Sequence, residues 1–300
     1  MEAKPSFLVR HEFLLRRLHS LTGLVPVGAY MVIHLLTNAS IWNGPATFQA
    51  AVHQIHSLGR LLPVVEWTFI FIPILFHGIY GLIILRESQP NPGAYPYLGN
   101  IRYTLQRATG LIAFLFIGWH VFHMHGWIHT EAWRAFIHPW GGQFAPYNAA
   151  SSATRAMQQS IWVQLFYLVG VVACVYHLAN GIWTMGITWG LWTSPAAQRR
   201  ADWVAVAVGV IVLALGLGAW SGFALRYDAS KPDVLRSMQE IEQRMLQRRI
   251  EEGLISEEEA KKKQDRYASF SGDTERIESV PRALAEQPSG TAPAQTHSGQ

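Results

Sequence analysis

Four histidines, each deep in a different apolar stretch, are the residues whose type and spacing could do chemistry: His34, His77, His120 and His177. An ionisable side chain inside a membrane span is rare and indicates function by default. For any one of them alone, a hydrogen bond to a neighbouring helix is the better explanation. Two imidazoles on one iron, however, fill both axial positions and favour electron transfer over oxygen chemistry. The four histidines therefore predict two bound haems if they lie in pairs at matching depths.

Helix geometry predicts that two of the histidines share an outer layer. His34 lies 17 residues after Arg17, and His120 lies 13 residues after Arg107. These separations are ~26 Å and ~20 Å along helices that rise about 1.5 Å per residue. Both stretches lead away from their basic residues in the same direction, so we expect His34 and His120 to lie together.

The other two histidines are expected in an inner layer. His77 precedes Arg86 by nine residues, or ~14 Å along a helix that runs the opposite way, and His177 lies well inside an overlong fourth stretch. Cys174 is the only cysteine, and no C-x-x-C-H run exists. Neither an internal disulfide nor thioether-attached haem is therefore possible, and we expect non-covalent haem b.

Five apolar stretches are long enough to position these side chains across a bilayer, which takes about 20 residues. Residues 1–225 hold only 12 basic and 6 acidic side chains, too little polar chain to cover five such stretches in a soluble protein. Glu66 is the only formal charge inside them. The stretches are Leu18–Asn38, Leu61–Leu85, Ala108–Ile128, Ile161–Trp192 and Trp203–Leu225.

The predicted fold is an all-α membrane protein, with five transmembrane helices bundled around two haems and a charged C-terminal extension. We place the transmembrane domain at residues 1–225 and the extension at residues 226–300, which hold 12 basic and 14 acidic residues. Residues 233–265 predict a weakly amphipathic helix or a short coiled coil. Residues 285–300 have the composition of a disordered segment.

Basic residues in the connections predict the orientation, because they are enriched on the cytoplasmic side. With a cytoplasmic N-terminus, nine basic residues fall on the inner side and three fall outside. An odd number of spans then puts the extension outside. The inner residues are Lys4, Arg10, Arg16, Arg17, Arg86, Arg102, Arg107, Arg199 and Arg200, and the outer ones are Arg60, Arg134 and Arg155.

The inner ends of the two outward spans carry basic and hydroxyl side chains: Arg17, His19, Ser20 and Arg107. Such residues suit haem propionates, which are anionic and prefer the membrane surface. A plain positive-inside anchor explains the arginines as well.

Two further sets of ionisable residues are expected near the outer end. Glu66 precedes His77 by 11 residues, or ~16 Å toward the outside, so it is a candidate proton carrier or else an interfacial hydrogen-bonding residue. His123, His125, His129 and His138 crowd the end of the third span. A zinc site is conceivable there, but solvated interfacial histidines are the favoured interpretation.

Four motifs, in order and each on its own span, together resemble one family, the five-helix di-haem cytochrome b membrane anchor of succinate dehydrogenase, of the succinate:menaquinone reductase type. The resemblance covers about residues 10–225, and the extension departs from it. The motifs are R-R-L-H-S-L-T-G-L-V-P-V-G with His34, F-I-P-I-L-F-H-G-I-Y-G (Phe71 to Gly81), L-Q-R-A-T-G with W-H at His120, and V-Y-H-L-A-N-G-I-W (Val175 to Trp183).

The resemblance implies a multi-pass protein of the bacterial cytoplasmic membrane that joins a flavoprotein subunit and an iron–sulfur subunit. It implies axial pairs His77/His177, nearer the iron–sulfur subunit, and His34/His120. The chain would be the quinone-reactive subunit of the complex, passing electrons to menaquinone or another quinone, and not by itself a catalyst for succinate. Two alternatives remain: a di-haem anchor of another membrane dehydrogenase, such as a hydrogenase or formate dehydrogenase, and a histidine-bearing transporter without haem.

The charge bias generates a topological prediction. A reporter that is active only outside the cytoplasm is expected to be active when fused after Gln300, because an odd number of spans carries the C-terminus across the membrane. The matched fusion after residue 92, in the connection that holds Arg86 and Arg102, is expected to be inactive. If the fusion after Gln300 is inactive and the fusion after residue 92 is active, the predicted orientation is wrong.

Overall fold

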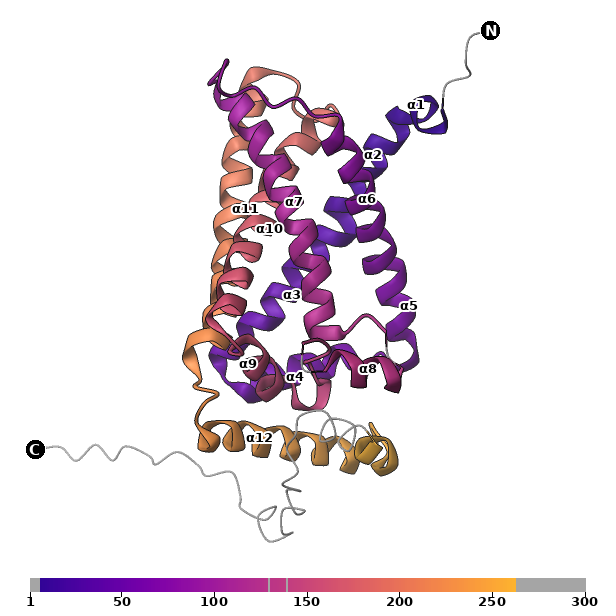
Figure 1. Cartoon of the computed structure of the whole chain (residues 1–300), viewed down its shortest axis with the longest axis vertical. Helices are drawn as coiled ribbons and strands as arrows, with labels where there is room; N and C mark the ends of the chain where they lie inside the picture. The colour runs from indigo at the N-terminus through magenta and orange to yellow at the C-terminus, as the bar shows by residue number, and fades with distance from the viewer. Residues whose placement is uncertain (1–5, 129, 139, 263–300) are drawn as a thin grey trace, which may run out of the picture.

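The computed structural model describes residues 6–128, 130–138 and 140–262, and within them it is helical, with no strand. Five helical rods of 28 to 32 residues stand side by side (Figure 1), each long and apolar enough to cross a membrane. The expected all-α membrane bundle is thus confirmed. The end that carries α1 (Phe7–Arg10) is called the inner end here, and the end with α4 (Pro45–His56) is called the outer end.

The first two rods each contain a π-helical segment next to a proline. The first runs through α2 (Glu12–Thr22), η1 (Gly23–Gly28), α3 (Ala29–Ala39) and η2 (Ser40–Asn43), with Pro26 inside η1. The second runs through η3 (Gly59–Leu61), α5 (Leu62–Glu66), η4 (Trp67–Phe71) and α6 (Ile72–Arg86), with Pro73 just after η4. Proline removes a backbone donor and clashes with the preceding turn, and a widened π-turn accommodates this without ending the rod.

The other three rods are continuous α-helices with capped ends. They are α7 (Leu98–His125), α10 (Ile161–Thr188) and α11 (Pro195–Ser221), the last extended by η6 (Gly222–Arg226). Ser160 and Ser194 cap α10 and α11 by accepting the backbone N–H groups of Val163 and Ala197. Gly126, with φ +82°, ends α7 in the left-handed conformation that glycine adopts without strain.

Several ends of the expected spans differ from the observed helices. The first and fifth rods begin at Glu12 and Pro195, before the expected Leu18 and Trp203. The third rod begins at Leu98, ten residues before the expected Ala108, because the helix continues through its own basic residues. The fourth ends at Thr188, before the expected Trp192. Beyond it Gly190 turns the chain at φ +71°, and the Trp192 indole folds back to donate to the carbonyl of Trp183.

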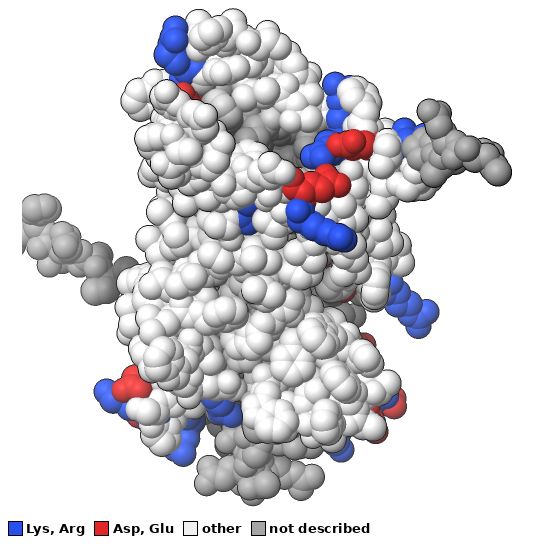
Figure 2. All heavy atoms as spheres, turned by 45° about the horizontal axis from the view of Figure 1, so that its top comes forward, with Lys and Arg blue, Asp and Glu red and all other residues white. Residues whose placement is uncertain are grey.

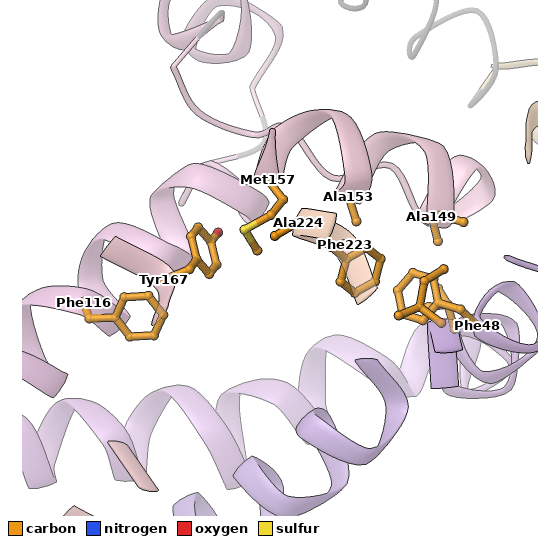
Figure 3. Packing of buried hydrophobic residues seen from close by; sticks show 11 residues of the cluster. Phe48, Phe116, Ala149, Ala153, Met157, Tyr167, Phe223 and Ala224 are labelled. Carbon is orange, nitrogen blue, oxygen red and sulfur yellow. The ribbon is translucent and has the colours of Figure 1, made fainter. Parts of the chain in front are cut away.

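Side chains near the outer end form the largest buried apolar cluster, in which α10 packs against α7 and α11. Phe116 and Tyr167 join α7 to α10, while Phe223 and Phe48 meet edge to face between η6 and α4 (Figure 3). Charged side chains gather toward the two ends and leave a broad belt of other residues between them (Figure 2). Large exposed apolar residues on the rods suit contact with lipid.

Helix α12 (Pro232–Glu251) lies across the outer end and packs against α4, η5 (Pro146–Asn148) and α9 (Ala149–Met157) (Figure 1). The helix expected over residues 233–265 thus ends at Glu251, and residues 263–265 and 285–300 lie outside the described residues. The division into domains at residue 225 stays a prediction, but the first helix of the extension has a buried face against the bundle.

A buried carboxylate joins α12 to the start of α9. Glu242 is 0% exposed and accepts hydrogen bonds from the backbone N–H and the hydroxyl of Ser151, at 2.8 and 2.7 Å, and from the Asn148 amide at 3.3 Å. Burial raises the pKa of Glu242 to about 7, although these hydrogen bonds oppose the rise. The carboxylate also interacts favourably with the N-terminal dipole of α9.

The raised pKa predicts that α12 docks less firmly at high pH. The docked carboxyl binds its proton more tightly than an exposed one, so docking is strongest below the ordinary pKa of 4.5 and weakens as pH rises through about 7. We expect tryptic cleavage within α12 to accelerate severalfold between about pH 5 and about pH 8. Glu242→Gln, which mimics the protonated acid, is expected to lose this acceleration.

Glu240→Gln is the matched control, because Glu240 is exposed on the same helix. Comparing both variants at each pH cancels the pH dependence of trypsin itself. If the ratio of the cleavage rate of Glu242→Gln to that of Glu240→Gln is the same at both pH values, the role of Glu242 is contradicted.

Candidate functional site

The four span histidines lie in two ring-to-ring pairs. The ring centroids of His77 on α6 and His177 on α10 are 6.0 Å apart, and those of His34 on α3 and His120 on α7 are 5.8 Å apart. Metal–nitrogen bonds of about 2.0 Å on both sides of one ion put the ring centroids roughly 6 Å apart. The pairs are those that the helix positions predict, and their spacing fits one metal ion between each pair.

In the inner pair, a backbone carbonyl group faces one nitrogen of each ring. His77 Nδ1 lies 2.8 Å from the carbonyl oxygen of His19, and His177 Nδ1 lies 3.1 Å from that of Gln106. A carbonyl oxygen can only accept, so both rings carry their proton on Nδ1 and keep a lone pair on Nε2. This is the usual arrangement of metal-binding histidines.

In the outer pair, tyrosine hydroxyl groups take the place of the carbonyls. His120 Nδ1 lies 3.2 Å from the hydroxyl of Tyr167, and His34 Nδ1 lies 3.5 Å from that of Tyr30. A hydroxyl can donate or accept, so these contacts alone leave the position of the ring proton open.

A chain of amide side chains holds the segment around His177. The guanidinium of Arg102 donates from Nε to Asn180 Oδ1 at 2.8 Å and pairs with Asp202. Asn180 Nδ2 donates to Gln106 Oε1 at 2.7 Å, and Gln106 Nε2 lies 3.2 Å from both the carbonyl oxygen and Nδ1 of His177. Because arginine only donates, it sets the orientation of both amides. The Gln106 amide then donates to the carbonyl.

Glycines let the inner rings approach the neighbouring helices. A Cβ atom on Gly23 would stand 2.2 Å from Cε1 of His77, and one on Gly110 would stand 2.8 Å from Cε1 of His177. Any side chain at either position would displace the ring. The glycines are therefore required by this packing rather than by backbone conformation.

A cavity of about 1370 Å³ runs between the first four rods and reaches both inner histidines. It exceeds the roughly 300–1,000 Å³ of a pocket for one small molecule. The outer pair does not itself line the cavity, although Gly118 and Trp119, which precede His120 in the sequence, do. The cavity thus has room for more than one ligand along the bundle.

At its inner end the cavity is lined by His19, Ser20 and Arg107. The Nδ1 atom of His19 and the Nε atom of Arg107 are buried, and neither has a hydrogen-bond partner among the described residues. Buried polar atoms normally have partners, so a bound anionic group would satisfy them. The His19 ring also stacks on His77, with centroids 4.0 Å apart.

The two arginines that precede His19 have different surroundings. Arg17 lies over the rings of Phe13 and Trp189 and donates to the carbonyl of Thr188, a residue of the cavity wall, but Arg17 itself does not line the cavity. Arg16 lines the cavity instead and pairs with Glu12 on its own helix and with Glu87 at the end of α6. A propionate contact from Arg17 stays a prediction, and Arg16 is the better placed of the two.

Glu66 lies at the junction of α5 and η4, where its side chain lines the cavity. It interacts electrostatically with Tyr30, whose hydroxyl contacts His34. The carboxylate therefore lies toward the outer pair, at the end that its position along the span predicts.

The sequence led us to expect that the outer histidines of α7 are solvated, but one of them is buried. His123 is 1% exposed and contacts Tyr167 and Gln159, because it lies one helical turn beyond His120 on the same face. Among the described residues no group of three or more histidine, cysteine or acidic side chains is arranged to hold a metal ion, and His129 lies outside them.

Sequence reasoning also missed Tyr167, Tyr30 and Gln106 as partners of the span histidines. Their spacing carries one weak signal: Tyr30 precedes His34 by four residues, the separation at which helical side chains meet. The other two reach their histidines from a different helix.

No protein-family model matches the chain. The succinate dehydrogenase cytochrome b558 subunit of Bacillus subtilis (strain 168) is 32% identical to it over 212 residues. The match covers 71% of this chain and 97% of that protein. Almost the whole relative is matched, while more than a quarter of this chain lies beyond the match.

Proposed function

The chain belongs to the family of succinate dehydrogenase cytochrome b subunits, and we propose that it carries electrons through two haems b from an iron–sulfur subunit to a membrane quinone. The observation that supports this proposal is the pairing of the four span histidines at 5.8 and 6.0 Å. As a member of this family with five apolar helices, it is a multi-pass membrane anchor.

Each histidine pair is proposed to hold one haem through its Nε2 atoms, His77 with His177 at the inner site and His34 with His120 at the outer site. A haem iron with two histidine ligands accepts and releases single electrons and keeps no open position for substrate. At the inner site, His19, Ser20 and Arg107 are proposed to bind the propionates, together with Arg17 as the sequence suggests. The unpartnered nitrogens of His19 and Arg107 support this assignment.

The two ends of the bundle suggest the order of events. The inner pair lies at the end that carries most of the basic residues of the five spans and their connections, residues 1–225, and we propose that an iron–sulfur subunit and its flavoprotein partner dock there from the cytoplasm. The outer pair and Glu66 lie at the other end. We propose that the quinone, menaquinone or a relative, is reduced near the outer pair and that Glu66 supplies protons to it.

The haem assignment predicts which substitutions remove which spectral component. His34→Ala and His120→Ala are each expected to lose one and the same haem, about half of the total, because a methyl group cannot ligate iron. His77→Ala and His177→Ala are expected to lose the other. Reduced-minus-oxidised spectra and extracted haem per protein measure both effects.

His11→Ala is the control, because His11 precedes the first rod and faces neither pair. It is expected to keep both haems. If His34→Ala and His77→Ala remove the same component, or if the unaltered protein holds no haem, the proposal fails.

The position of Glu66 predicts a kinetic effect without loss of haem. Glu66→Gln keeps the size of the side chain but cannot release a proton, so quinone turnover is expected to fall on the order of tenfold to a hundredfold. Succinate should still reduce both haems. Glu131→Gln, at an exposed carboxylate of α8 (Glu131–Ile137), is the control. Normal turnover in Glu66→Gln would leave Glu66 a structural role only.

A further inference from the structure

Tyr167 of α10 lies between two histidines of α7. Its hydroxyl oxygen is 3.2 Å from Nδ1 of His120 and 2.9 Å from Nδ1 of His123. Beyond it, Nε2 of His123 lies 3.2 Å from Oε1 of Gln159. Tyr167 is 5% exposed and His123 is 1% exposed, so water has little access to the contact between them.

The direction of this chain of hydrogen bonds follows from its last member. In the orientation that the Gln159 amide has here, its oxygen faces Nε2 of His123 and can only accept, so His123 donates from Nε2 and its Nδ1 is left as an acceptor. The single hydroxyl proton of Tyr167 is then donated to His123 Nδ1. The hydroxyl oxygen can therefore only accept from His120, which must carry its proton on Nδ1.

We infer that Tyr167, oriented by His123 and Gln159, is a positioning residue that fixes the ring proton of His120 on Nδ1 and leaves Nε2 free to bind the outer haem iron. This inference rests on the proposed function. It names three residues that neither bind the iron nor line the cavity.

The packing around the chain holds its members in place. The indole of Trp119 stacks on the His123 ring, with centroids 4.5 Å apart and planes 14° apart. The Tyr167 ring meets those of Phe116, Trp119 and His120 edge to face at 5.4–5.5 Å. The hydroxyl therefore has one well-defined position.

At the inner pair the acceptors that face Nδ1 of both rings are backbone carbonyls, although the Gln106 side-chain amide also lies 3.2 Å from Nδ1 of His177. The proton positions there are set by the backbone carbonyls of His19 and Gln106, which no substitution removes. Only at the outer pair does a single side-chain hydroxyl decide which nitrogen of the histidine is free. A substitution of that hydroxyl should therefore act on one haem alone.

An acceptor on the ring N–H makes the imidazole a stronger electron donor to its metal, which favours the oxidised iron. In Tyr167→Phe this acceptor is lost, and the midpoint potential of the outer haem is expected to rise while that of the inner haem stays unchanged. The measurement is a redox titration followed at both spectral components, on the purified full-length protein with its co-purifying subunits.

Tyr80→Phe is the matched control. Tyr80 is 7% exposed near the inner end, beside His19, so the variant also deletes one buried tyrosine hydroxyl. It is expected to leave the outer potential unchanged. A rise of the outer potential in Tyr167→Phe alone supports the inference, and unchanged potentials in Tyr167→Phe overturn it.

Substitutions of His123 test the direction of the chain. His123→Leu removes the acceptor of the Tyr167 hydroxyl, which is then free to donate to His120 Nδ1 and to favour the wrong ring proton position. We expect the outer haem to bind more weakly, with its share of the total haem reduced. His123→Gln keeps an acceptor oxygen and is expected to restore much of that share.

The outcomes separate this inference from the proposed function. An unaltered protein without two haems overturns the proposed function itself. Two haems in the unaltered protein, with equal outer haem content in His123→Leu and His123→Gln, overturn the direction of the chain alone. If Tyr167→Phe loses both haems, the bundle is disturbed and the His123 variants decide.

Discussion

The structure depends on one constraint: a histidine ring inside an apolar bundle has two nitrogens, and each needs a partner. Here Nδ1 of every span histidine faces an oxygen on a helix of the bundle, a backbone carbonyl for His77 and His177 and a tyrosine hydroxyl for His34 and His120. The rings themselves meet in pairs, with centroids 5.8 and 6.0 Å apart. The hydrogen bonds therefore do more than satisfy polar atoms, because they set which nitrogen can bind a metal. Helix positions that failed to supply these oxygens would leave either an unpaired nitrogen or the wrong one free.

Irregular segments and glycines in the helical rods help to place the histidine rings. The π-helical segments η1 and η4 follow from Pro26 and Pro73, and both segments adjoin the cavity between the first four rods. Gly23 and Gly110 bring two helices close enough for the inner rings to meet. Straight rods with bulky side chains at these places would pack into a solid bundle, with neither ring pairs nor a cavity.

Depth in the membrane could be predicted from the sequence, whereas contacts between helices could not. A rise of about 1.5 Å per residue converts position into depth, which is why the pairing of His34 with His120 and of His77 with His177 followed from counting residues. Rotation about each helix axis depends on packing against its neighbours, and counting does not show it. Tyr167 and Gln106 were missed for this reason, as was the burial of His123. Glu242 was missed because its burial depends on packing against α9, a contact between segments 91 residues apart in the sequence that counting along one helix does not show.

The two ring pairs take their hydrogen bonds from different groups of the chain. This difference decides how easily a substitution can change each pair. The inner pair takes its hydrogen bonds from the backbone, so its geometry is protected from most substitutions. The outer pair takes them from Tyr30 and from Tyr167, and the second of these depends in turn on His123 and Gln159. Gln159 is exposed at the outer end, so the chain connects a buried ring to the surface through only two intervening side chains. An electron carrier whose last site must match its acceptor needs such an adjustable end, and the outer pair is the one nearer to Glu66, where we place the quinone.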